Sequence, residues 1–112
     1  MSRRYVEYPS TKDMEIIVQS VVREGKMFRR SRCWGLVREG EGYVLEHYGV
    51  RLVKVEGSVV TPLYASTETD KNGVNRLTCM LGLGSVCRYD RKKQEVKWML
   101  THSSLRATVY II

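Results

Sequence analysis

Residues 33–63 read CWGLVREGEGYVLEHYGVRLVKVEGSVVTPL, and this stretch decides the predicted fold. Short runs of β-branched and aromatic residues alternate with glycine-containing turns, a pattern typical of antiparallel strands joined by tight connections. We expect strands over residues 33–38, 43–48, 50–55 and 59–63. Because Pro62 lacks the N–H that a central strand donates, the last strand is expected at a sheet edge.

Two segments outside this region have the periodicity of helices. The first is predicted over residues 11–24, where Gly25 can end it in a left-handed conformation. Its apolar side chains share one helix face at i, i+3, i+4, i+7 and i+8: Met14, Ile17, Val18, Val21 and Val22. The second helix is predicted over residues 70–81, which also have one apolar face and are followed by two glycines.

The C-terminal part of the chain again has the pattern of strands. Residues 85–101 predict a β-hairpin that turns around residues 90–94, and residues 105–112 alternate apolar and polar side chains. The expected fold class is α+β: one small domain over residues 1–112, with an antiparallel β-sheet and two helices. If residues 105–112 form an open sheet edge, two copies of the chain could pair there as a homodimer.

Composition limits the class of protein. The 112 residues are 43% hydrophobic and 28% charged, and no apolar stretch approaches the roughly 20 residues that a membrane-spanning helix needs. The first residues contain arginines with no apolar segment behind them, so they do not resemble a secretion signal. We therefore expect a protein that stays in the cytoplasm of the cell that makes it and does not bind membranes.

The residues that usually carry catalysis or bind metals form no recognisable motif. The three cysteines, Cys33, Cys79 and Cys87, contain no Cys-x-x-Cys pair, which argues against disulfides and a structural zinc site. Cys79 and Cys87 are expected in the core as small apolar side chains. His47 and His102 have no catalytic motif around them, so the sequence predicts no enzyme, no metal site and no cofactor.

The formal net charge of +7 is concentrated in two stretches that also contain aromatic rings. Residues 23–38 have six Lys or Arg and one acid, a balance of +5, and include Phe28 and Trp34. Residues 88–98 have five Lys or Arg and two acids, a balance of +3, and include Trp98. Arginine pairs with phosphate or carboxylate through two parallel hydrogen bonds, so the pattern indicates an anionic partner. The alternative is that the basic residues form an ordinary solvated surface and that the aromatic rings belong to the core.

Half of the chain resembles a family of short, uncharacterised proteins encoded by tailed bacteriophages and prophages. The resemblance rests on His47-Tyr48-Gly49, on the segment from Tyr64 to Thr69, and on Val74-Asn75-Arg76-Leu77. The later Tyr89-Asp90-Arg91-Lys92-Lys93 is similar to the closing hairpin of that family. The resemblance implies a small α+β fold and an origin in a virus or mobile element, and it carries no activity over to this chain.

Two functions are compatible with these observations. In the first, the protein binds nucleic acid, DNA or RNA, through a continuous positive surface with one exposed ring that stacks on a base, for which Trp34 is the candidate. In the second, the same surface binds a host protein, such as a nuclease of an anti-phage defence system, which the phage protein inhibits. The candidate binding residues for either partner are Arg29, Arg30, Arg32, Trp34, Arg91, Lys92 and Lys93.

Overall fold

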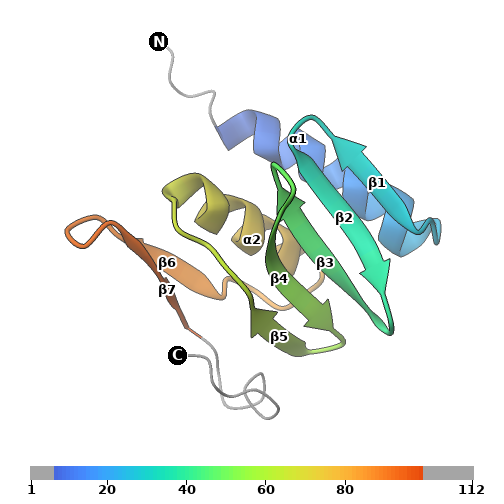
Figure 1. Ribbon diagram of the computed structural model, residues 1–112. Coiled ribbons are helices and arrows are strands. Elements are labelled where there is room, and N and C mark those ends of the chain that lie inside the picture. The colour runs from blue at the N-terminus through green and yellow to red at the C-terminus, as the bar shows by residue number, and fades with distance from the viewer. Residues whose placement is uncertain (1–6, 100–112) are drawn as a thin grey trace.

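The computed structural model describes residues 7–99, and its main feature is a five-stranded antiparallel sheet in the order β1-β2-β3-β4-β5 (Figure 1). The expected α+β class is confirmed, and β5 lies at an edge as Pro62 predicts. The predicted strand over residues 105–112, with the homodimer that depends on it, lies outside the described residues. The strands are β1 (Phe28–Ser31), β2 (Trp34–Glu39), β3 (Gly42–His47), β4 (Val50–Glu56) and β5 (Val59–Pro62).

Each connection within this sheet is two residues long, which makes the sheet a simple meander. The strand registers pair Ser31 with Trp34 across the first turn and His47 with Val50 across the third. In an antiparallel meander the first and third turns lie at the same end of the sheet. The turns Arg32-Cys33 and Tyr48-Gly49 are therefore neighbours.

Strand β1 is the element that sequence patterns did not predict. Its four residues, Phe28-Arg29-Arg30-Ser31, carry two adjacent charges and only one apolar side chain. It is an edge strand, and its sequence has none of the alternation that marks a half-buried strand. Arg29 and Arg30, expected in a connecting segment, instead lie on a strand and point to opposite sheet faces.

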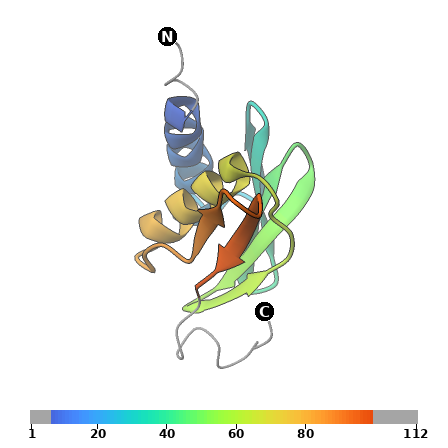
Figure 2. The same cartoon turned by 90° about the vertical axis from the view of Figure 1, so that its left-hand side faces the viewer.

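Both helices pack on the same face of the sheet, as Figure 2 shows. The first, α1 (Glu7–Val18), begins four residues before the predicted start at residue 11. At its C-terminal end it continues as a π-helical turn, η2 (Gln19–Arg23). Pro9 falls in the first turn, where a missing N–H costs no helical hydrogen bond. Gly25 has the expected left-handed conformation, with φ of 79°.

The second helix, α2 (Glu68–Met80), begins two residues before the predicted start at residue 70. Thr67 caps it by accepting a hydrogen bond from the Asp70 N–H, while the Asp70 side chain accepts one from the Thr67 N–H. This reciprocal capping box satisfies two N–H groups that have no partner inside the helix. Asp70 is therefore the third residue of the helix and lies at its buried side.

A separate hairpin of β6 (Cys87–Asp90) and β7 (Glu95–Trp98) packs against α2. This confirms the predicted hairpin and its turn at residues 91–94. The amide of Asn75 on α2 ties the two together, because its Oδ1 accepts from the N–H of Val86 and Cys87 and its Nδ2 donates to the Cys87 carbonyl.

The hydrophobic core fills the space between the sheet and the two helices. Fully burying an aliphatic side chain of this size contributes about 1.5–3 kcal/mol to stability. Cys87 belongs to this core as predicted, whereas Cys79 is exposed on α2, so the prediction of a buried Cys79 is wrong. The largest fully buried side chains are Met14, Ile17, Leu36, Leu45, Leu52 and Leu77.

The opposite sheet face carries balanced charge among residues 7–99. Arg30, Arg51 and Lys54 alternate there with Glu39, Glu46 and Glu56, and several of them form exposed ion pairs. With three cations against three anions, this face offers no net attraction for a polyanion.

Candidate pocket at one end of the sheet

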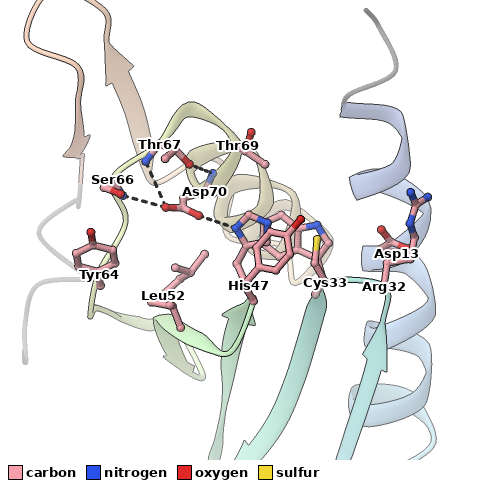
Figure 3. A pocket seen from close by; sticks show the side chains of 13 residues that line it. Asp13, Arg32, Cys33, His47, Leu52, Tyr64, Ser66, Thr67, Thr69 and Asp70 are labelled. Carbon is pink, nitrogen blue, oxygen red and sulfur yellow. Dashed lines mark hydrogen bonds and ion pairs between the residues drawn. The ribbon is translucent and has the colours of Figure 1, made fainter. Parts of the chain in front are cut away.

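A pocket of about 660 Å³ opens where the Arg32-Cys33 turn, the Tyr48-Gly49 turn, residues 64–67 and the start of α2 meet (Figure 3). Ligand pockets in proteins usually have volumes of about 300–1,000 Å³, so this one can hold a nucleotide-sized group. Arg32 and Asp13 lie at one side of it, and Tyr64 and Ser66 lie at the other (Figure 3).

A β-bulge shapes the Tyr64 side of the pocket. The register between β3 and β4 shifts at Leu45 and Glu46, which leaves Leu52 as an extra residue on β4. The Leu52 carbonyl accepts hydrogen bonds from the N–H groups of both Leu63 and Tyr64, each at 3.0 Å. Bulges re-aim side chains beside functional sites, and here the bulge fixes the segment that carries Tyr64.

His47 forms the floor of the pocket together with Trp34. The two residues are directly opposite each other on β2 and β3, and their rings stack with centroids 4.0 Å apart. Trp34 is only 2% exposed. The sequence-based expectation that Trp34 is an exposed ring able to stack on a base is therefore wrong: its side chain faces the helices, where it packs against α2.

Asp70 holds His47 from the side of α2. The distance between His47 Nδ1 and Asp70 Oδ1 is 2.8 Å, and Asp70 Oδ2 accepts from the N–H groups of Ser66 and Thr67. Burial alone would raise the pKa of Asp70, but these hydrogen bonds outweigh burial and hold the pKa below its ordinary value. An ionised carboxylate only accepts hydrogen bonds, so Nδ1 carries the proton and donates it to Asp70.

Tyr48 stands at the mouth of the pocket and is 77% exposed. Its N–H donates to the Cys33 carbonyl at 2.8 Å, which ties the two neighbouring turns together. A hydrogen bond between the Tyr48 and Cys33 side chains raises the pKa of the Tyr48 hydroxyl, so this group stays protonated at neutral pH. Both turns are strained, since Arg32 and Tyr48 have positive φ angles of 59° and 55°.

The cation that lines the pocket comes from the first basic stretch. Arg32 is an exposed pocket residue on one side. In the second stretch, Nη2 of Arg91 in the β6–β7 turn lies 3.4 Å from Oε2 of Glu68, the first residue of α2, and neither residue lines this pocket. The backbone of this turn is fixed, because Asp90 Oδ1 accepts from the N–H groups of Lys92 and Lys93.

The predicted continuous positive surface does not form. Arg29 and Arg30 lie on β1, at the opposite side of the molecule from Lys92 and Lys93 in the β6–β7 turn (Figure 1). Arg29 donates to Ser20 Oγ at 3.2 Å, and the Arg30 guanidinium lies 5.7 Å from the centre of the Phe28 ring. Of the predicted binding residues, Arg32 and the buried Trp34 line the pocket, and Arg91 lies beside Glu68 at the start of α2.

Sequence reasoning missed Tyr48, Tyr64 and the pairing of His47 with Asp70. The last two residues are 23 positions apart on different elements, so no local motif reveals their contact. One feature of the sequence could have indicated the pocket. Two of the segments that carry the resemblance to phage proteins meet there: His47-Tyr48-Gly49 and residues 64–69.

Within residues 7–99, no three or more His, Cys, Asp or Glu side chains gather as a metal site would require. No helix in the same range is long and apolar enough to span a membrane. Comparisons with known proteins find no matching family model, no matching curated protein and no matching solved structure. The resemblance to phage proteins thus stays a prediction.

Proposed function

We propose that this protein binds single-stranded nucleic acid and takes one unstacked base into the pocket. The observation that carries the proposal is the position of two exposed tyrosines at the pocket mouth, Tyr48 at 77% and Tyr64 at 55% exposure. Proteins that bind single strands use exposed aromatic rings as stacking platforms, because every base has a flat π face. Bases within a duplex are already stacked and cannot enter such a pocket.

The charges around the pocket support the same ligand. The two carboxylates that line it both have partners within the protein: Asp70 accepts a hydrogen bond from His47, and Asp13 accepts one from Ser31 at 2.7 Å. The cation among the lining residues is Arg32, which is exposed at one side of the pocket. A base against the tyrosines and a phosphate beside Arg32 fit this distribution, and a strand that continues along the start of α2 reaches Arg91 and then Lys92 and Lys93.

In this proposal the protein is an accessory protein of a phage or mobile element and acts in the cytoplasm of the host, where single-stranded nucleic acid is accessible. Its origin rests on the resemblance of about half the chain, roughly residues 36–100, to phage proteins. The proposal includes both single-stranded DNA and single-stranded RNA as ligands, because base stacking and phosphate contacts are possible with either.

A second candidate function is the inhibition of a host protein, and edge strand β1 favours it. Met27 is 64% exposed and Phe28 is 43% exposed, and the Arg30 guanidinium lies 5.7 Å from the centre of the Phe28 ring. Exposed apolar residues next to an arginine on an open strand edge are typical of protein interfaces. This surface is separate from the pocket, so variants distinguish the two functions.

The experiment that tests the proposal is fluorescence anisotropy with labelled single-stranded DNA, single-stranded RNA and duplex DNA, at about 50–200 mM salt. We expect binding to both single strands, weaker binding to the duplex and a steep loss of affinity with salt. Arg32→Glu should weaken binding, while Arg23→Glu, an exposed arginine at the opposite end of α1, is the matched control. Absence of single-strand binding at the lowest salt overturns the proposal and favours the second candidate function, protein binding at β1.

A further inference from the structure

The pairing of His47 with Asp70 places a general base in the pocket. The N–H at Nδ1 donates its hydrogen bond to Asp70, which leaves Nε2 as the ring nitrogen with no hydrogen-bond partner among residues 7–99. A histidine held by a carboxylate, with its second nitrogen available in a pocket, is the arrangement that proteins use for general-base catalysis.

The ring of His47 is held firmly enough for such a role. It lies between the indole of Trp34, at 4.0 Å, and the ring of Tyr48, at 4.7 Å. Its partner Asp70 is fixed in turn by the N–H groups of Ser66 and Thr67 at 3.0 and 3.2 Å. Both side chains are largely buried, at 12% and 8% exposure, so solvent competes little for the hydrogen bond between them.

A general base needs a nucleophile, and RNA supplies its own in the 2′-hydroxyl beside each phosphate. We propose that the pocket cleaves single-stranded RNA by transesterification with His47 as the general base, which rests on the proposed binding function. Nε2 of His47 takes the 2′-hydroxyl proton while the 2′-oxygen bonds to the adjacent phosphorus and the bond from phosphorus to the next 5′-oxygen breaks. That 5′-oxygen takes a proton from water, and the resulting hydroxide takes the proton from His47. The products are a 2′,3′-cyclic phosphate and a 5′-hydroxyl.

Two further groups at the pocket can stabilise the negative charge that develops on the phosphoryl oxygens during the reaction. Arg32 is positively charged and exposed at the pocket, where its guanidinium can contact phosphoryl oxygens. The Tyr48 hydroxyl stays protonated at neutral pH and can donate a hydrogen bond to the same oxygens. Asp70 is a positioning residue, since it acts on the substrate only through His47.

The test incubates end-labelled single-stranded RNA of mixed sequence with the purified protein in a chelator, and identifies the products. We expect 2′,3′-cyclic phosphate ends and no cleavage of DNA of the same sequence. His47→Gln should lower the cleavage rate by about 10²-fold or more, the usual contribution of a general base. Asp70→Asn should lower the rate and also change the shape of the pH–rate profile, whereas a structural defect lowers the rate alike at every pH.

Glu41→Gln, an acid-to-amide change in an exposed turn at the other end of the sheet, is the matched control and should cleave normally. If His47→Gln fails to fold, Arg32→Glu on the exposed turn gives the second variant, and we expect it to slow cleavage at least 10-fold.

The outcomes separate this inference from the binding proposal. Binding of uncleavable 2′-O-methyl RNA without cleavage of RNA overturns the ribonuclease and leaves the binding function in place. Cleavage that persists in folded His47→Gln, or in folded Arg32→Glu at an unchanged rate, overturns His47 catalysis in this pocket. Absence of both binding and cleavage overturns both proposals.

Discussion

Gly73 of α2 lies directly against the indole ring of Trp34 on β2, so closely that any β-carbon at position 73 would overlap the ring. This contact lets the helix approach the sheet while Trp34 lies flat beneath His47. Glycine is unfavourable in a helix interior by about 1 kcal/mol relative to alanine, and close packing offsets that cost here. Glycine at position 73 therefore suits the close packing against Trp34 in the pocket floor, although it lowers the helix propensity of α2.

Gly73→Ala should therefore destabilise the protein despite the better helix propensity of alanine. Overpacking a core usually costs about 1–3 kcal/mol, and we expect a net loss within that range. The measurement is urea denaturation followed by Trp fluorescence. Arg76→Ala, an exposed change on the same helix, is the control and should alter the free energy of unfolding by less than about 0.5 kcal/mol. A stabilised Gly73→Ala variant would contradict the packing.

Stability should depend on the charge of Asp70 at acidic pH. The pKa of Asp70 is lower in the folded chain than its ordinary value of 3.8, so the folded state binds fewer protons than the unfolded state. The resulting stabilisation is fully present above about pH 4 and is lost as the pH falls through the folded pKa. Asp70→Asn should cost about 1–3 kcal/mol at pH 7.

The check is chemical denaturation of wild type and Asp70→Asn from pH 7 down to about pH 3. The difference between their free energies of unfolding should narrow toward the acidic end. A difference that stays constant over this range would mean that the Asp70 charge does not contribute to the folded state.

The three cysteines should differ in their reactivity toward a thiol reagent. Burial raises the pKa of Cys87 to about 12, so its thiolate is scarce at neutral pH, whereas Cys79 is exposed on α2 and Cys33 is half-buried at the pocket. We expect one fast-reacting thiol, lost in Cys79→Ser, and a Cys87 that reacts only on unfolding. Fast labelling of Cys87 in the native protein would contradict its place in the core.

The two exposed tyrosines should carry much of the affinity for single strands. Replacing a ring that stacks on a base costs about 1–3 kcal/mol, so Tyr48→Ala and Tyr64→Ala should each weaken binding by about 5-fold to more than 100-fold. Phe28→Ala is the matched control, because Phe28 is also an exposed ring but lies on edge strand β1. Equal losses in all three variants would mean that the pocket has no special role.

The strands of the sheet were predictable where runs of β-branched and aromatic residues are bounded by glycine-containing turns. Strands β2 to β5 follow this rule, and the helix boundaries shift by a few residues because capping at Thr67 and the helical first turn at Pro9 override the simplest signals. Edge strand β1 was missed because its adjacent arginines mask the pattern.

The pocket itself was not predictable, since it forms from segments that only the meander and the bulge at Leu52 bring together. Trp34 illustrates the difficulty. Its neighbours in sequence are basic and suggest an exposed ring, yet its register opposite His47 directs the side chain toward α2.

The most direct test of the central claim is a titration of ¹⁵N-labelled protein with a short single-stranded oligoribonucleotide carrying 2′-O-methyl groups, followed by two-dimensional NMR. The account predicts that the largest backbone shifts occur in residues 32–33, 48–50 and 64–70, with smaller shifts in residues 91–93. Shifts confined to residues 27–31 on β1, or no shifts at saturating ligand, would contradict the pocket as the binding site.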